Sequence, residues 1–410
     1  MMTRLAPATP EELTNAGDPL YGVRLILGIG FLSILALTPN LWLSSRAIPL
    51  VPLIPLIGPF PHPLDIAFLV VLILSVLYSL LRRSAGVLFL IAALLAVAGV
   101  QDQNRIMPWG YQLFVMYLVC GMGLLSPRTH ERQATTRNLL RIILICIYFW
   151  SGVLKINRAF LHVVAPSFLE PLSRLGFPSD VIDVLTVLFG IVAPFFEAGL
   201  AVALLFPASR KVAIVGIVCM HLLILGALGP LGVSYNSSVW PWNIMMMVLV
   251  PVLLWRDAPY VPDLLPLKRT FVTVGVLLAV GVLPALRIVH RWDTYLSFGM
   301  YVGNTPTGVV LITPEGVDKL PSDLRRHAVE GSPEGTHYEV SMHKWLLAEL
   351  NSPPYPETRI LLALAQWWCD LKLPPNSLLI EINSWSSPTQ RRPLSTVYEC
   401  SNGTLRRRAQ

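Results

Sequence analysis

The sequence predicts an all-α polytopic membrane bundle of about nine transmembrane helices, followed by a small extracytoplasmic α+β domain. Of the 410 residues, 54% are hydrophobic and only 13% are charged, and the mean hydropathy is +0.60. Soluble globular proteins carry about 25% charged residues, so this composition favours a membrane protein. Long apolar runs recur up to residue 289, and shorter mixed segments follow. We therefore expect a transmembrane domain over residues 1–289 and an outer domain over residues 290–410.

Nine apolar runs are the candidate transmembrane helices. A perpendicular helix needs about 20 apolar residues to cross a bilayer, and several of these runs are slightly shorter, so counts of eight or ten are alternatives. The runs are Gly22–Leu37, Leu64–Leu81, Ser84–Val100, Tyr111–Leu125, Leu139–Lys155, Val184–Phe206, Val212–Leu228, Trp240–Trp255 and Phe271–Val289.

The basic residues predict the orientation of the chain in a cell membrane. Connections on one side hold Arg4, Arg82, Arg83, Arg128, Arg132, Arg137, Arg210, Lys211, Arg256, Lys268 and Arg269, whereas the other side holds only Arg46, Arg105, Arg158 and Arg174. Cytoplasmic loops are enriched in Lys and Arg, so the N-terminus is expected in the cytoplasm and the C-terminal domain outside. The basic residues lie in short clusters between apolar runs rather than on one face. This distribution argues against nucleic acid as a partner, despite a net charge of +7.

Three ionisable residues stand in the apolar runs, where a charge is costly and needs a reason. Lys155 ends its run, where either the helix dipole and snorkelling or a functional role explains it. Glu197 and His221 stand well inside consecutive antiparallel runs, so at about 1.5 Å rise per residue they are expected at a similar depth. We expect an ion pair or hydrogen bond between them. That pair serves either to fasten the helices or as a proton relay or catalytic pair.

The connection before the fourth run carries polar residues that apolar packing does not explain. Asp102, Asn104 and Arg105 together offer an anion contact and hydrogen bonds at the outer mouth of the bundle. They are the predicted cofactor-binding residues. Trp109 and Tyr111, which follow, are typical of an interfacial aromatic belt.

The C-terminal region has the mixed pattern of a small α+β domain. Its predicted strands are Gly308–Ile312, Tyr338–Val340, Ser377–Ile382 and Thr396–Glu399, and its predicted helices are Met342–Leu350 and Pro356–Leu371. Cys369 and Cys400 are either a disulfide, which an oxidising compartment would preserve, or two unpaired thiols. His327, His337 and His343 show no metal-ligand spacing and are expected at the surface, so no metal site is predicted.

The segment Tyr148–Asn157 resembles a known family signature. It is similar to the Tyr-Phe-x-x-Gly-x-x-Lys-Leu-Asp/Asn motif of the vitamin K-dependent gamma-carboxylase-like family, also called the horizontally transferred transmembrane domain (HTTM) family. The resemblance covers residues 139–255. It implies an integral membrane enzyme of the carboxylase/epoxidase type, which acts with reduced vitamin K or another lipophilic quinone at the outer face. In that case the catalytic base would be Lys155, and Glu197 and His221 would line the site.

Three hypotheses follow for the function. The first is the membrane enzyme that the resemblance implies. The second is a transport or lipid-binding protein in which Glu197 and His221 line a pathway. The third is a non-catalytic scaffold whose outer domain binds a partner. The expected partners are membrane lipid and either an extracytoplasmic protein or a lipophilic small molecule.

Overall fold

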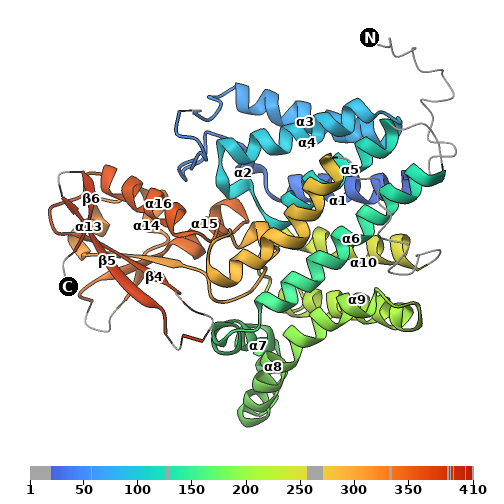
Figure 1. Ribbon diagram of the computed structural model, residues 1–410. Helices are drawn as coiled ribbons and strands as arrows, with labels where there is room; N and C mark the ends of the chain where they lie inside the picture. The colour runs from blue at the N-terminus through green and yellow to red at the C-terminus, as the bar shows by residue number, and fades with distance from the viewer. Residues whose placement is uncertain are drawn as a thin grey trace.

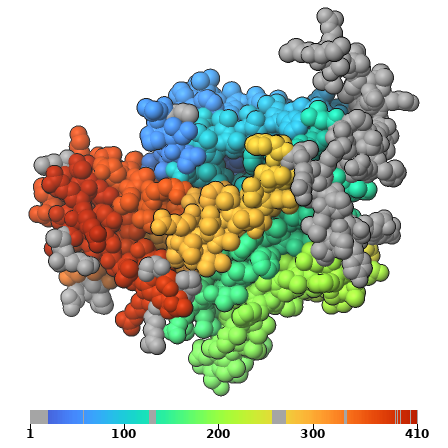
Figure 2. All heavy atoms as spheres, in the orientation of Figure 1, coloured from blue at the N-terminus to red at the C-terminus, as the bar shows by residue number. Residues whose placement is uncertain are grey.

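The computed structural model consists of a helical body and a C-terminal region built on a six-stranded sheet. The structure describes residues 20–56, 58–125, 130–255, 271–331, 335–385, 387, 389–390, 392–401 and 403–408. Figure 1 shows the sheet at one end of the molecule and the long helices at the other. In Figure 2 the segment that follows residue 271, in yellow to orange, lies between the early helices and the sheet region.

Every predicted apolar run coincides with helical structure among the described residues. The helices of the body are α1 (Tyr21–Leu37), α2 (Pro39–Trp42), α3 (Leu64–Leu81), α4 (Ala85–Gln101), α5 (Pro108–Leu125), α6 (His130–Leu154), α7 (Ala165–Arg174), α8 (Ser179–Ala203), α9 (Pro207–Leu228), α10 (Val239–Leu254) and α12 (Phe271–Leu277), which continues in π and 3₁₀ geometry to Val289.

Six of these helices are long and apolar enough to cross a membrane. They are α3, α5, α6, α8, α9 and the helix from Phe271 to Val289. The apolar helices α1, α4 and α10 are shorter, with 17, 17 and 16 residues. A multi-pass membrane protein is therefore supported, whereas the predicted count of nine spans is not confirmed.

Exposed apolar faces fit a lipid environment. On α8 the side chains of Val184, Leu188 and Phe195 are 68%, 55% and 59% exposed. Large exposed apolar patches are unfavourable in water, but lipid tails solvate such residues without cost.

The predicted orientation stays a prediction. It depends in part on Arg4, Arg128, Arg256, Lys268 and Arg269, which lie outside the described residues.

Helices α6 and α8 pack closely at a glycine. A Cβ atom added at Gly152 would lie 2.5 Å from the backbone nitrogen of Ala198 and 2.8 Å from the carbonyl oxygen of Pro194. Any larger residue would push the helices apart, because those neighbours are backbone atoms. This contact brings the C-terminal end of α6 against the middle of α8.

The C-terminal sheet is antiparallel throughout, in the order β2-β3-β1-β4-β5-β6. Its strands are β1 (Thr307–Ile312), β2 (Val329–Glu330), β3 (Tyr338–Ser341), β4 (Leu378–Ser384), β5 (Leu394–Ser401) and β6 (Thr404–Arg407), and its helices are α13 (Pro314–Asp318), α14 (Ser322–Arg325), α15 (Met342–Leu350) and α16 (Thr358–Asp370). Helices α15 and α16 contact the sheet, and they bury Trp345 and Trp368 in the core.

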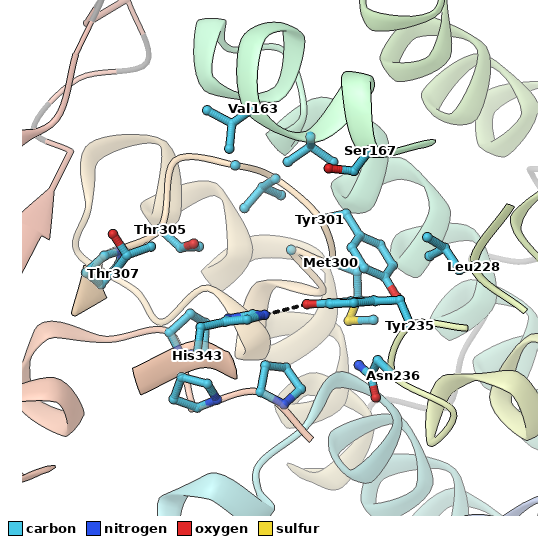
Figure 3. Close-up of a pocket in the computed structure, with 18 of the residues that line it drawn as sticks. Val163, Ser167, Leu228, Tyr235, Asn236, Met300, Tyr301, Thr305, Thr307 and His343 are labelled. Atoms are coloured by element: carbon cyan, nitrogen blue, oxygen red, sulfur yellow. Dashed lines mark hydrogen bonds between the residues drawn. The ribbon is translucent and has the colours of Figure 1, made fainter. Parts of the chain in front are cut away.

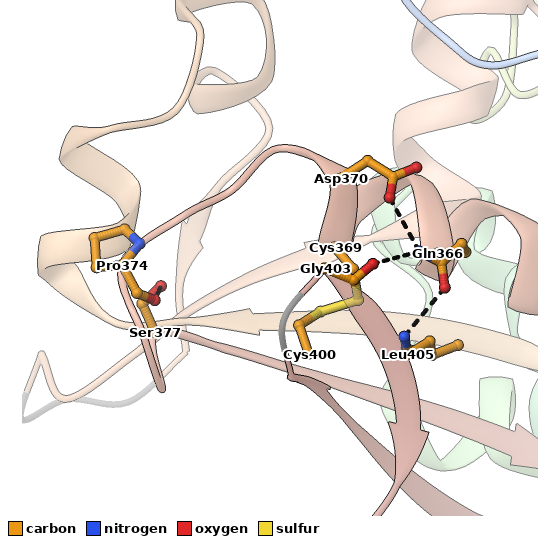
Figure 4. The surroundings of a disulfide bond; sticks show 8 residues. All are labelled: Gln366, Cys369, Asp370, Pro374, Ser377, Cys400, Gly403 and Leu405. Carbon is orange, nitrogen blue, oxygen red and sulfur yellow. Dashed lines mark hydrogen bonds between the residues drawn. A yellow bond between two sulfur atoms is a disulfide. The ribbon is translucent and has the colours of Figure 1, made fainter.

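A disulfide joins α16 to β5. The Cα atoms of Cys369 and Cys400 are 5.4 Å apart, within the usual range for a bridge. Figure 4 shows Gln366 beside this bridge: its side chain donates to the carbonyl of Gly403 and accepts from the backbone nitrogen of Leu405. Of the two alternatives for these cysteines, the structure has the bridged one.

Candidate functional site

Lys155, which directly follows α6, is held by a carboxylate from α8. Its Nζ donates to Glu197 Oε2 at 2.6 Å and to Ser151 Oγ at 2.7 Å. The side chains of Lys155 and Glu197 are only 10% and 12% exposed. The close packing at Gly152 allows this contact, because it brings the two helices together one turn earlier in α6. The result is a nearly buried ion pair.

His221, on α9, forms a second polar group with two neutral side chains. Its Nε2 lies 2.8 Å from the hydroxyl of Tyr148, and its Nδ1 lies 2.7 Å from Oδ1 of Asn243. The amide nitrogen of Asn243 donates to the Val239 carbonyl, so Oδ1 is the acceptor. Nδ1 therefore carries the proton, and Nε2 accepts from Tyr148. A neutral imidazole satisfies every partner in this group.

The predicted pair of Glu197 with His221 is wrong. Glu197 bonds to Lys155, and His221 bonds to Tyr148 and Asn243. The prediction paired these two residues because they lie at a similar depth on consecutive spans. The hydrogen-bond partners in the structure come instead from the end of α6 and from α10. Glu197 is nevertheless near enough to act electrostatically on both Tyr148 and His221.

The two groups share one face of α6. Tyr148, Ser151 and Lys155 stand three and four residues apart, the spacing that aligns side chains on a helix. Arg141, seven residues before Tyr148, continues the same face, is buried, and donates to the Leu253 carbonyl at 2.7 Å. We call the line from Arg141 to Lys155 the polar track.

Asp102 is fully buried and accepts four hydrogen bonds. Its donors are Arg46 Nη2 at 2.5 Å, the backbone nitrogen of Val51, and the backbone and side-chain nitrogens of Asn104. Four donors satisfy most of the capacity of a carboxylate. Asp102 thus ties the connection between α4 and α5 to the one between α2 and α3.

Asn104 and Arg105 are buried as well. Asn104 Oδ1 accepts from the backbone nitrogen of Tyr355, in the C-terminal region, at 3.0 Å. Arg105 donates to the carbonyls of Leu41 and Trp42. Burial lowers the pKa of Arg105 to about 10, and the charge of Asp102 opposes that shift. These contacts hold the loop to the rest of the protein, and ligand contact by Asp102, Asn104 and Arg105 stays a prediction.

Sequence reasoning missed the uncharged side chains that are hydrogen-bonded to Lys155 and His221. The sequence alone predicts no role for Tyr148 and Ser151, which lie in the segment that resembles the family signature, or for Asn243, which lies in an apolar run. Helical spacing could have identified some of them, because polar residues three or four positions from Lys155 lie on the same face of the helix as Lys155.

One family comparison matches the part of the chain that carries this cluster. The sequence model of methylamine utilisation protein MauE matches residues 133–237, about a quarter of the chain. No curated protein and no solved structure matches the chain. The matched segment contains Lys155, Glu197 and His221.

This match corrects the resemblance to the vitamin K-dependent carboxylase-like (HTTM) family. The residues that carried that resemblance, Tyr148–Asn157, lie inside the segment that matches MauE instead. The carboxylase-like reaction and the vitamin K cofactor have no support from the match. The protein is an integral membrane protein whose segment 133–237 is similar to MauE.

Proposed function

We propose that this integral membrane protein moves protons along the polar track and couples that movement to transport. One observation carries the proposal: Lys155 and Tyr148 share one face of α6, and each is hydrogen-bonded there to an ionisable residue of a neighbouring helix, Glu197 on α8 and His221 on α9. Ionisable residues inside membrane segments mark ion pathways and proton relays more often than they serve packing alone. The segment that is similar to MauE contains both groups.

The ion pair is the part of the track that can bind and release a proton. Adding a proton to Glu197 neutralises the carboxylate and leaves the Lys155 ammonium without its counter-charge. In a medium of low dielectric that unpaired charge is costly. In the proposed path, a proton that reaches Glu197 is therefore balanced by the release of a proton from Lys155.

Tyr148 and His221 extend the path away from the pair. Tyr148 donates its hydroxyl proton to Nε2 of His221, and the phenol oxygen then accepts a proton in return. Each such step leaves Tyr148 neutral and makes His221 a cation. Lys155 and Tyr148 are about 10 Å apart along the axis of α6, with Ser151 between them. Bridging water molecules are therefore required for a proton to pass between Lys155 and Tyr148.

The experiment is proton flux into liposomes that contain the purified full chain. Glu197→Gln removes the titratable carboxylate, and Tyr148→Phe removes the relay hydroxyl while leaving the ion pair intact. Both variants are expected to lower the flux at least about tenfold. Asp183→Asn, which neutralises an exposed carboxylate on the same helix α8, is the matched control and should leave flux unchanged.

Two outcomes separate this proposal from a scaffold. Glu197→Gln lowers thermal stability in either case, but if the buried groups only fasten helices, both Glu197→Gln and Tyr148→Phe leave a wild-type flux in the folded and inserted protein. That result would overturn the proposal. Methylammonium, the protonated form of the amine in the name of MauE, is the first cargo to add to the assay.

A further inference from the structure

The pocket at the junction of the helical body and the C-terminal region has a volume of about 450 Å³. This volume is within the range of small-molecule sites. Its walls come from the π-helical turn before α7, from α7, from the loop between α9 and α10, and from residues 295–308 and α15. Figure 3 shows Val163 and Ser167 on one side of this space and the Tyr235–His343 pair across from them. We call this space the junction pocket.

Apart from Glu170, the described polar side chains that line the junction pocket are uncharged. The hydroxyl of Tyr235 and Nε2 of His343 share a hydrogen bond of 2.5 Å. Burial lowers the pKa of His343 and raises the pKa of Tyr235 to about 12, so both are neutral at neutral pH. His343, expected at the surface, is partly exposed and lines the pocket. Among the described lining residues the one carboxylate is Glu170, which is exposed and paired with Arg174 at 2.9 Å.

A buried amide in the wall has an unused end. The Asn236 side chain belongs to a residue that is only 4% exposed, and its Oδ1 accepts from Ser238 Oγ at 2.6 Å. Its amide nitrogen has no partner among the described residues, and Figure 3 shows that nitrogen on the pocket side. This nitrogen is accessible from the pocket, so it can donate a hydrogen bond to a polar group of a ligand there. The hydroxyls of Ser167 and Thr305 also line the pocket, and neither has a hydrogen-bond partner in the described part of the chain.

The remaining lining is mostly apolar, and α7 places it beside lipid. With 10 residues, α7 is too short to cross a bilayer. Apolar residues that flank α7 are exposed, Val163 before it at 55% and Leu175 after it at 73%. Short amphipathic helices with exposed apolar residues lie in the membrane interface. An interfacial position of α7 would let a lipid enter the pocket from the side.

We propose that the junction pocket binds an uncharged lipid whose hydroxyl-bearing end contacts Asn236, Ser167 and Thr305 and whose acyl chain extends along α7. An anionic lipid is disfavoured because no lysine or arginine is among the described lining residues. A lipid ammonium is disfavoured because the one lining carboxylate already has Arg174 as its partner. This inference is independent of the proton path, since no residue of the polar track lines the pocket.

The probe is 1-monooleoylglycerol, with oleate as a charged lipid of the same chain. Binding to the detergent-solubilised full chain is followed by native mass spectrometry over a lipid titration. Saturable binding of the monoacylglycerol is expected, with oleate at least about tenfold weaker. Equal or tighter binding of oleate would overturn the proposal.

Two pairs of variants place the lipid. Ser167→Trp fills the pocket from α7 and should abolish saturable binding, whereas Ser173→Trp on the same helix, outside the lining, should not. Asn236→Asp keeps the acceptor for Ser238 and replaces the free donor by a charge. It should weaken binding about tenfold.

Asn376→Asp is the matched control for Asn236, because both residues have positive φ (46° and 61°) and Asn376 is exposed outside the pocket. Wild-type binding in Ser167→Trp, or equal losses in Asn236→Asp and Asn376→Asp, would refute the site.

Discussion

The ion pair between Lys155 and Glu197 predicts a large coupling energy between these two positions. At an effective dielectric of about 20, charges this close attract by roughly 4–6 kcal/mol, and desolvation offsets much of that gain. Removing one member leaves a nearly buried charge alone. We therefore expect Lys155→Met and Glu197→Gln each to destabilise the fold by about 2–4 kcal/mol.

The double variant should lose much less folding free energy than the sum of the losses in the two single variants. With both charges gone, no unpaired charge is left, so we expect a coupling energy of about 2–3 kcal/mol. The assay is reversible unfolding in mixed detergent micelles, followed by circular dichroism. The control cycle uses Arg174 and Glu170. Their side chains are 58% and 52% exposed, and Arg174 Nη2 lies 2.9 Å from Glu170 Oε1. Exposed pairs of this kind contribute less than about 1 kcal/mol.

This reasoning would be refuted if the free-energy changes of the two single variants at Lys155 and Glu197 added up to that of the double variant within about 0.5 kcal/mol. It would mean that water or lipid headgroups screen the pair as completely as they screen the pair on α7. A cycle between Glu197 and His221 should show weaker coupling than the one with Lys155, because no hydrogen bond joins Glu197 to His221.

Three further predictions concern the region outside the polar track. Replacing both Cys369 and Cys400 by serine should cost about 3–4 kcal/mol, since the bridge closes a loop of 31 residues; denaturant unfolding of the full chain measures this. Burial lowers the pKa of His343, so the unfolded chain binds a proton there more readily than the folded chain. The contribution of the neutral His343 to folding stability should therefore be fully present above about pH 6.5 and should be lost as the pH falls towards the folded-state pKa. Thermal unfolding measured at several pH values should show a weaker pH dependence for His343→Gln. Asp102→Asn should destabilise the fold by roughly 2–4 kcal/mol, because it leaves Arg46 buried without its counter-charge, and it should leave the residual folded protein with normal proton flux.

Apolar patterning predicted the helices well because lipid or a protein core must solvate each run. Leu64–Leu81 was predicted with the same bounds that the structure shows, and the strand at Gly308–Ile312 was predicted to within one residue. Helix α6 begins earlier than predicted, at His130 rather than Leu139. Hydropathy does not detect a helix that continues beyond the apolar region into polar sequence.

Side-chain partners were harder to predict because they depend on which helices meet. Nothing in the spacing of Glu197 shows that the end of α6 packs against it, since that contact depends on the absence of a side chain at Gly152. The same point explains the wrong family. Gly152 allows α6 and α8 to pack closely, and Lys155 bonds to a carboxylate of α8, so the Gly-x-x-Lys pattern fits this helix pair without the carboxylase-like reaction.

Proton flux through the reconstituted protein tests the central claim most directly. Under an imposed pH gradient, we expect the wild type and Asp183→Asn to dissipate the gradient at the same rate, and Glu197→Gln and Tyr148→Phe to do so at least about tenfold more slowly. Equal rates in all four proteins, each shown to be folded and inserted, would contradict the account.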